Sequence, residues 1–231
     1  MAGIFYGIGV GPGDSELLTV KATKVLQKVD VIIAPKTEKK DGSVALRIAR
    51  PYLKEDIEIC YQVFPMVKDF QNDSTAWEEN KREIAGFLNA GKNVAFLTLG
   101  DPMFYSTYIY VLRLLQKDGV KVETIPGIPA YVAIASKYNR PIAEGDDILS
   151  IIPATANAED IKAALKYSKN AVLMKVYRNF DEVRELLKDS DMIDDAILVS
   201  RLGLDDEMQI EVKFAENLKL NYLSTILTGR K

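Results

Sequence analysis

Histidine is absent from this chain of 231 residues, and cysteine occurs once, at Cys60. The absence of histidine excludes a histidine general base, a catalytic triad that depends on one and a zinc site with histidine ligands. A single cysteine cannot form a disulfide within the chain, and with no histidine beside it we expect no protein-bound metal. Acid–base chemistry falls to Asp, Glu, Tyr or Lys. This composition favours a reaction that depends on placing its reactants rather than on shuttling protons.

Two further features are missing: an excess of positive charge and an apolar run long enough to span a membrane. The 30 Lys and Arg residues are outnumbered by 33 Asp and Glu residues, which gives a net charge of −3. We therefore expect neither nucleic acid nor a membrane as a partner. No signal peptide is recognisable, so the sequence predicts a cytoplasmic protein. The length suits one large domain or two small ones.

The glycine motifs of nucleotide-binding folds are absent as well. In the G-x-G-x-x-G frame that starts at Gly7, Pro12 replaces the third glycine, and in the frame that starts at Gly9, Asp14 replaces it. The chain also lacks a G-x-x-x-x-G-K-[ST] sequence. A predicted strand nevertheless ends in the glycine-rich turn 11–14, before a helix. As an N-cap, Asp14 would bind the helix N–H groups that a phosphate needs and would repel the phosphate.

A second turn of the same kind follows the apolar run 94–99. The residues Gly100, Asp101 and Pro102 end this predicted strand, and a helical pattern begins at Tyr105. In open α/β sheets, ligands bind at the carboxyl ends of strands where the strand order reverses, and Gly100 lets the backbone approach a ligand closely. Asp101 is therefore a candidate ligand-binding or catalytic residue, although it would equally serve as a cap of the helix. Two acidic turns suit a ligand with hydroxyl groups or positive charge better than a pyrophosphate.

Strands and helices alternate along the chain, which predicts an α/β fold. We expect an N-terminal α/β domain over residues 1–126 with a mostly parallel sheet and a C-terminal α/β domain over residues 127–231 with a mixed sheet, in which 202–212 forms an antiparallel hairpin. Residues 64–75 are polar and irregular, which fits a mobile flap or, more commonly, a solvated loop. The predicted strands cover residues 3–9, 29–34, 58–61, 93–99, 121–125, 148–153, 171–176, 196–200, 208–213 and 223–227. The predicted helices cover residues 16–27, 44–52, 77–90, 105–117, 130–136, 158–165 and 180–188.

Five segments, in order along the chain, resemble the motifs of a known family. Residues 7–22, which begin Gly-Ile-Gly-Val-Gly-Pro-Gly-Asp, are similar to the opening signature of the tetrapyrrole methylases, and residues 99–102 and 125–128 resemble that family's second and third motifs. Weaker matches follow at 172–175 and 198–203. The family consists of S-adenosylmethionine-dependent enzymes of cobalamin and sirohaem biosynthesis. The resemblance implies two α/β domains with the active site in the cleft between them, and a homodimer.

Within the family, residues 100–108 and 141–146 look like the precorrin-2 C20-methyltransferase branch. The implied reaction is S-adenosylmethionine-dependent methyl transfer to the C20 meso carbon of precorrin-2, or of cobalt-factor II on the cobalt-first route, in cobalamin biosynthesis. The alternatives are a related tetrapyrrole methylase that acts at another position and a non-catalytic module that binds a tetrapyrrole or a nucleoside.

The resemblance also places particular residues against the cofactor. Pro129 stands where many relatives carry Ser or Thr, so only backbone contacts carry over there, and a plainer explanation is a turn residue. Met174 is explained equally plainly as a core residue. The implied cofactor-binding residues are Leu99, Gly100, Asp101, Phe104, Pro129, Ala130, Met174, Leu202 and Gly203.

Precorrin-2 is a polycarboxylate, so a chain without a basic excess must meet it with a local cluster of cations. Uroporphyrinogen methylases of the family usually carry an acidic residue, proposed as a base, where this chain has Pro35 and Lys36. Lys36 would instead meet a substrate carboxylate, or it is an exposed lysine in a charged run. Arginine grips a carboxylate with two parallel hydrogen bonds, although each arginine alone is more often a surface charge. The candidate substrate-binding residues are Gly11, Pro12, Gly13, Lys36, Arg47, Arg140, Lys175, Arg178 and Arg201.

The implied reaction asks for little acid–base chemistry. The C20 carbon of a reduced tetrapyrrole is enamine-like and already nucleophilic, and the sulfonium methyl is a good electrophile. The protein has to align carbon, methyl and sulfur and to exclude water, and alignment contributes up to about 7–11 kcal/mol without a covalent intermediate. A proton then leaves C20 to water or to a carboxylate, and the sequence leaves both possibilities open.

Overall fold

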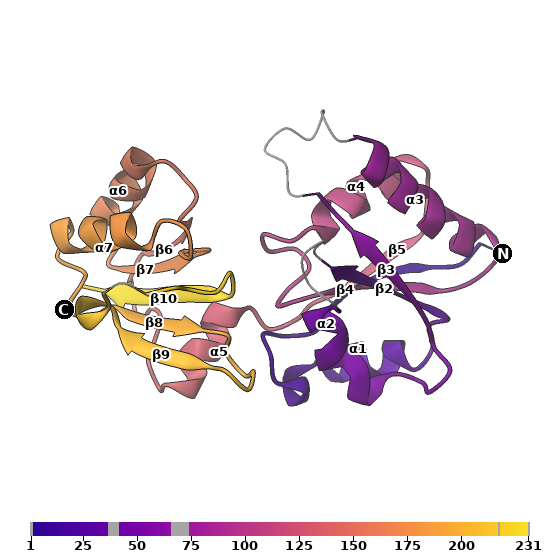
Figure 1. Ribbon diagram of the computed structural model, residues 1–231, viewed down its shortest axis with the longest axis horizontal. Coiled ribbons are helices and arrows are strands. Elements are labelled where there is room, and N and C mark those ends of the chain that lie inside the picture. Colours follow the sequence, from indigo (N-terminus) through magenta and orange to yellow (C-terminus); the bar gives the residue numbers. More distant parts are fainter. Residues whose placement is uncertain (1, 37–41, 66–73, 217, 231) are drawn as a thin grey trace. The chain divides into compact units, whose positions relative to one another are not determined.

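The computed structural model describes residues 2–36, 42–65, 74–216 and 218–230 (Figure 1). The chain divides into two compact units, Met1–Pro129 and Ala130–Lys231. None of the described helices is both long and apolar enough to cross a membrane. Most of the segment 64–75, predicted as a flap or a loop, lies outside the described residues.

The first unit is built around a five-stranded sheet with the order β3-β2-β4-β1-β5. All of its strand pairs are parallel, in agreement with the mostly parallel sheet that the sequence predicted. Helices cover both faces, α1 and α2 on one side and α3 and α4 on the other (Figure 1). The strands are β1 Phe5–Gly9, β2 Val31–Lys36, β3 Glu58–Val63, β4 Val94–Thr98 and β5 Val122–Ile125. The helices are α1 Val20–Leu26, α2 Val44–Ala49, α3 Ser74–Asn89 and α4 Tyr108–Lys117, with 3₁₀ turns η1 Ser15–Leu17 and η2 Arg50–Tyr52.

Strand β4 shows why this sheet needs helices on both faces. All of its residues are buried. Val94 and Phe96 belong to the core cluster formed with α3 and α4, whereas Ala95 and Leu97 belong to the cluster formed with α1 and α2. An uninterrupted buried run of this kind is typical of a central strand in a parallel sheet.

The strand order creates a topological switch point between β1 and β4. These strands are neighbours, but the connection through α1 leads from β1 to β2 on one side, and the connection through α4 leads from β4 to β5 on the other. Backbone hydrogen bonds join their carboxyl ends: Gly100 N donates to Gly11 O at 2.8 Å, and Gly11 N donates to Gly100 O at 3.3 Å. Ligands of open α/β sheets bind at such a point, and the two predicted turns meet there.

Two predicted helices differ in the structure. The predicted helix 16–27 is interrupted, and α1 starts only after Thr19, whose hydroxyl caps it. The helix predicted from Tyr105 begins later, as α4, because Tyr105 adopts a left-handed backbone conformation with φ 48°. Residues 99–107 therefore form a longer strand-end loop than the sequence predicted.

The second unit contains a mixed five-stranded sheet with the order β6-β7-β10-β8-β9. Strands β6 and β7 are parallel, β10 is antiparallel to β7 and β8, and β8 and β9 form the antiparallel hairpin that the sequence predicted. Helices α6 and α7 cover one face and α5 lies against the other (Figure 1). The strands are β6 Leu149–Pro153, β7 Asn170–Met174, β8 Ile197–Ser200, β9 Met208–Glu211 and β10 Ser224–Gly229. The helices are α5 Ala130–Lys137, α6 Ala158–Tyr167 and α7 Phe180–Asp189, with a 3₁₀ turn η3 Val212–Phe214.

Candidate functional site

Glycines let three strand ends of the first unit pack backbone against backbone. A Cβ on Gly127 would lie 2.2 Å from Gly100 O, and a Cβ on Gly9 would lie 2.5 Å from Gly127 N. Both distances are far below van der Waals contact, so only glycine fits at these two positions without a shift of the backbone. The carboxyl ends of β1, β4 and β5 thus meet at the switch point.

Asp101 ties this strand-end site together through both carboxylate oxygens. Its Oδ1 accepts the N–H of Met103 at 2.8 Å, and its Oδ2 accepts the N–H of Gly127 at 3.0 Å, 26 residues further along the chain. Helix α4 begins after Thr107, which occupies its N-cap position, so the interpretation of Asp101 as the cap of this helix is wrong. The carboxylate is half-buried and keeps lone pairs beyond those two bonds.

The site is acidic and contains a buried hydroxyl group. Asp14 Oδ1 accepts the N–H of Glu16 at 2.9 Å and caps η1, as predicted. The turns 11–14 and 99–104 carry two carboxylates and no Lys or Arg. Thr98 Oγ1, at the end of β4, is buried without a hydrogen-bond partner among the described residues. An unpaired buried hydroxyl is costly, so this strand end offers a polar group that a ligand would satisfy.

The other predicted cofactor-binding residues of the first unit flank Asp101. Leu99 is half-buried and packs against the core cluster of α1 and α2. The Phe104 ring packs edge-on against the Tyr105 ring, with 4.8 Å between the ring centres. The Cα of Pro129 lies 3.9 Å from the position that a Cβ on Gly100 would take. The structure therefore brings the predicted cofactor-binding residues of this unit to the carboxyl end of one sheet.

In the second unit, the predicted residues Met174, Leu202 and Gly203 lie at the same ends of the strands in the middle of the sheet. Met174 ends β7 and lies opposite Thr225 of β10. Ser200 ends β8 and lies opposite Ser224, on the other side of β10. Met174 and the segment 201–203 therefore lie at the same end of the strands, one on each side of β10.

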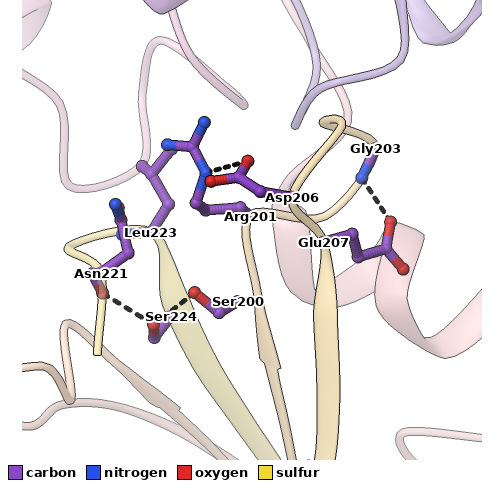
Figure 2. A network of polar contacts seen from close by, with 8 residues as sticks. All are labelled: Ser200, Arg201, Gly203, Asp206, Glu207, Asn221, Leu223 and Ser224. Carbon is purple, nitrogen blue, oxygen red and sulfur yellow. Dashed lines mark hydrogen bonds and ion pairs between the residues drawn. The ribbon is translucent and has the colours of Figure 1, made fainter. Parts of the chain in front are cut away.

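Two cations directly follow these strand ends. Lys175 and Arg201 both adopt left-handed backbone conformations, with φ 60° and 56°. Residues other than glycine adopt such conformations at a cost of about 1–3 kcal/mol, and they cluster at functional sites. Lys175 is half-buried, and burial lowers the pKa of its ammonium group. Arg201 forms an ion pair with Asp206 through Nε (Figure 2).

A network of polar contacts lies at the same strand ends (Figure 2). Ser224 Oγ lies 2.9 Å from Ser200 Oγ and 2.7 Å from the carbonyl oxygen of Asn221. Gly203 N donates to Glu207 Oε2 at 2.7 Å. The turn after β8 is therefore held by side chains that the sequence did not single out.

The other predicted substrate-binding cations lie on different elements. Lys36, at the end of β2, has its Nζ 5.8 Å from the centre of the Tyr61 ring. Arg178 follows β7, and its guanidinium carbon lies 5.2 Å from the centre of the Tyr177 ring. Arg47 is exposed on α2. Each of them therefore already rests on an aromatic ring or on the surface of its own element.

Arg140 lies near the opposite strand ends of the second sheet from Met174 and Arg201. Its guanidinium forms an ion pair with Asp195, and both residues line a pocket of about 270 Å³ beside the start of β7. Within this unit, the structure does not bring Arg140 together with Lys175.

The described residues offer neither a metal centre nor an activated thiol. In 2–36, 42–65, 74–216 and 218–230, no three Cys, Asp or Glu side chains are grouped as metal ligands. Burial, and then hydrogen bonding and repulsion from Glu83, raise the pKa of the Cys60 thiol to about 12. A thiol with that pKa stays protonated at neutral pH and is a poor nucleophile.

Comparison with known proteins identifies the family. The family model described as Tetrapyrrole (Corrin/Porphyrin) Methylases matches residues 5–217. The chain belongs to the tetrapyrrole methylase family. This tetrapyrrole methylase carries the family's second and third motifs, 99–102 and 125–128, in the loops that form its strand-end site.

Two known relatives are similar over almost the whole chain. The cobalt-precorrin-2 C(20)-methyltransferase of Salmonella typhimurium is 34% identical over 100% of this chain and 98% of its own length. The probable cobalt-precorrin-2 C(20)-methyltransferase of Methanocaldococcus jannaschii is 37% identical over 91% of this chain and 88% of its own. The solved structure of uroporphyrin-III C-methyl transferase from Thermus thermophilus, complexed with S-adenyl homocysteine, covers 98% of this chain and 97% of its own, with a TM-score of 0.74 and 19% identity. That likeness shows a shared fold.

Proposed function

We propose that this tetrapyrrole methylase transfers a methyl group from S-adenosylmethionine to the C20 meso carbon of precorrin-2 or its cobalt complex, a step of cobalamin biosynthesis. The observation that carries the proposal is the 34% and 37% identity, over nearly the whole chain, to two proteins named as C20-methyltransferases of cobalt-precorrin-2. Identity to the uroporphyrin-III C-methyl transferase of Thermus thermophilus is 19%, and identity to the uroporphyrinogen-III C-methyltransferase of Bacillus subtilis is 28% over 93% of this chain. The proposal keeps both acceptors, because the precorrin-2 C(20)-methyltransferase of Sinorhizobium is also 34% identical, over 86% of this chain.

The strand-end site of the first unit fits a cationic methyl donor. Asp14 and Asp101 share the turns 11–14 and 99–104 with no basic residue, and the Thr98 hydroxyl has no partner among the described residues. Bound S-adenosylmethionine supplies an electrophilic methyl group on a positively charged sulfur. The proposed contacts in this unit are Leu99, Gly100, Asp101, Phe104 and the backbone of Pro129. In the second unit they are Ala130, Met174, Leu202 and Gly203, on the family resemblance alone.

In the proposed reaction, the residues of the strand-end site bind and orient. Asp101 holds the turn after β4 against Gly127, so the backbone around Gly100 keeps one geometry. The apolar side chains of Leu99 and Phe104 exclude water from the methyl group. Fixed alignment of the reacting atoms contributes up to about 7–11 kcal/mol to lowering the barrier. The proton released from C20 goes to water or to a carboxylate.

Lys175 and Arg201 are the strongest candidates for binding the acceptor's carboxylates. They directly follow β7 and β8 at the same strand ends, with β10 between them. Their backbones are therefore about two strand spacings, roughly 9–10 Å, apart. That separation suits two carboxylates of one tetrapyrrole. The wider proposed set contains Gly11, Pro12, Gly13, Lys36, Arg47 and Arg178. Arg140 is left out of this set because it lies at the opposite strand ends, beside the start of β7.

The decisive experiment locates the transferred methyl group. The protein is incubated with S-adenosylmethionine labelled with ¹³C at the methyl group and with precorrin-2, with and without cobalt, and the product is analysed by carbon NMR. We expect one labelled methyl on the C20 bridge carbon, and the comparison of turnover with and without cobalt identifies the acceptor. Label on a pyrrole carbon, or two methyls added to uroporphyrinogen III, would show that the chain belongs to another branch of the family. Binding of both ligands without consumption of the donor would identify a non-catalytic module.

A further inference from the structure

The side chain of Glu207 receives three hydrogen-bond donors. Gly203 N lies 2.7 Å and Lys137 Nζ 2.6 Å from its Oε2, and Tyr138 OH lies 2.8 Å from its Oε1. Only 15% of the Glu207 side chain is exposed. A carboxylate is well suited to accept from an ammonium, a phenol and an amide at once, because both of its oxygens are acceptors.

These three donors come from two segments that both contain proposed contacts of the methyl donor. Lys137 is the last residue of α5, whose first residue is Ala130, and Tyr138 directly follows the helix. Gly203 lies in the turn after β8, beside Leu202. Glu207 therefore joins α5 and this turn, although the contacts to α5 span 69 and 70 residues of sequence.

The turn from Arg201 to Glu207 needs such an anchor. Arg201 and Gly203 both have positive φ values, 56° and 72°. Two backbone hydrogen bonds, from Leu204 N to Arg201 O and from Glu207 N to Leu204 O, both at 3.0 Å, close the turn internally. Through its carboxylate, Glu207 adds the bond to Gly203 and the two bonds to α5.

The electrostatics agree with a fixed, ionised carboxylate. Burial alone raises the pKa of Glu207, but the hydrogen bonds from Lys137, Gly203 and Tyr138 outweigh burial and hold the pKa below its usual value. Burial, together with the hydrogen bond to Glu207 and its charge, raises the pKa of Tyr138 to about 12. The phenol therefore stays protonated and keeps its proton for the carboxylate.

We infer that Glu207 is a positioning residue of the methyltransferase, which fixes the turn carrying Leu202 and Gly203 against α5 and so holds both segments in the geometry that binds the methyl donor. The inference rests on the proposed function, and it assigns Glu207 no contact with the donor or the acceptor. The bond from Lys137 joins two opposite charges, and such charge-assisted bonds are about twice as strong as neutral ones.

The experiment compares three substitutions in the full chain. Glu207→Ala removes the anchor. Glu207→Gln keeps one acceptor oxygen for Gly203 and Lys137 and presents an NH₂ group to the Tyr138 oxygen. Asp205→Ala is the matched control, because it removes a carboxylate from the exposed part of the same turn. Calorimetry measures the dissociation constant for S-adenosylhomocysteine, and hydrogen exchange followed by mass spectrometry measures protection of the peptide 201–207.

For Glu207→Ala we expect a dissociation constant about tenfold above that of the wild type and loss of exchange protection in the turn. Glu207→Gln should restore most of the affinity, and Asp205→Ala should match the wild type. Binding is measured well below the melting temperature of each variant, so a role confined to stability would leave the affinity unchanged. If Glu207→Ala does not fold, the double variant Lys137→Met with Tyr138→Phe removes only the anchors to α5 and should lower the affinity in the same direction.

Two outcomes separate this inference from the proposed function. A wild type that does not bind S-adenosylhomocysteine would overturn the proposed function, and the inference with it. A wild type that binds the ligand, together with a folded Glu207→Ala or double variant of equal affinity, would overturn the inference alone.

Discussion

At the scale of single residues, Asp101 combines a structural bond with a charge that remains available. Each of its oxygens accepts one backbone N–H, from Met103 or Gly127. A carboxylate has about four lone-pair directions, so these bonds leave acceptor capacity and a negative charge at the switch point. A neutral side chain of the same shape would keep only part of the hydrogen bonding to the backbone and would carry no negative charge.

Replacement of Asp101 by Asn should therefore weaken both the fold and the binding of the methyl donor. Asn has one acceptor oxygen, so the N–H of Met103 or of Gly127 would face an NH₂ group. We expect the free energy of unfolding to fall by about 1–3 kcal/mol and the dissociation constant for S-adenosylmethionine to rise about tenfold or more. Urea unfolding and calorimetry measure the two effects.

Asp14→Asn is the matched control for the stability effect of this substitution. Asp14 accepts a single N–H as the cap of η1, and Asn caps a helix about as well as Asp. We expect its free energy of unfolding to change by less than about 0.5 kcal/mol. Unchanged donor affinity in a folded Asp101→Asn protein would mean that Asp101 is purely structural.

The lowered pKa of Glu207 predicts that part of the free energy of unfolding is lost in acid. Its pKa in the folded protein lies below the ordinary value of 4.5 because the bonds from Lys137, Gly203 and Tyr138 outweigh burial. Stability from such a group is fully present above the unfolded pKa and is lost as the pH falls through the folded pKa. The wild type should be more stable than Glu207→Gln at neutral pH, and the difference should shrink below pH 4.5. Denaturant unfolding at several pH values tests this, and a difference that stays constant with pH would contradict it.

At the scale of elements, the ends of β1, β4 and β5 can meet only because their loops carry glycine. A Cβ at Gly127 would lie 2.2 Å from Gly100 O, so Gly127→Ala must push the ends of β4 and β5 apart. We expect a loss of about 1–3 kcal/mol in the free energy of unfolding and a clear loss of donor binding. Thermal unfolding and calorimetry provide the measurements.

Gly86→Ala offers the contrasting substitution. Gly86 lies in α3, and a Cβ added there would have no atom of a described residue within 4 Å beyond its own helix backbone and chain neighbours. Alanine is a better helix former than glycine by up to about 1 kcal/mol, so this variant should be slightly more stable and should bind the donor as the wild type does. Equal behaviour of the two alanine variants would argue against a special role for the strand-end glycines.

Local patterns predicted the elements better than their ends and better than the contacts between them. Strand β4 and its turn were predictable because a short apolar run followed by Gly-Asp-Pro can be recognised within a few residues. The late start of α4 was not, because the left-handed backbone of Tyr105 is not set by propensity. Glu207 was missed because two of its partners lie 69 and 70 residues away. For the same reason, the pairing of Arg140 with Asp195, 55 residues apart, left no trace in the sequence.

At the scale of the whole molecule, we predict a homodimer. The prediction rests on the family resemblance, and the exposed side chains of Met103, Tyr105 and Tyr110 add apolar surface on the first unit. Light scattering at micromolar concentration should give twice the chain mass of 25.8 kDa. A monomer at that concentration would contradict the prediction.

The strand order also has a consequence for how the chain is made. Strand β1 is the first strand of its sheet to be synthesised, and it pairs with β4 and β5, whose residues begin at Val94 and Val122. At about 5–20 residues per second, the apolar segment Phe5–Gly9 waits several seconds for its first neighbour, while β2 and β3 can already pair. A nascent chain in which β4 has not yet been made exposes β1 without a partner strand, which is an aggregation hazard. The interval before β4 has emerged is therefore the one in which we expect the nascent chain to be most prone to aggregation.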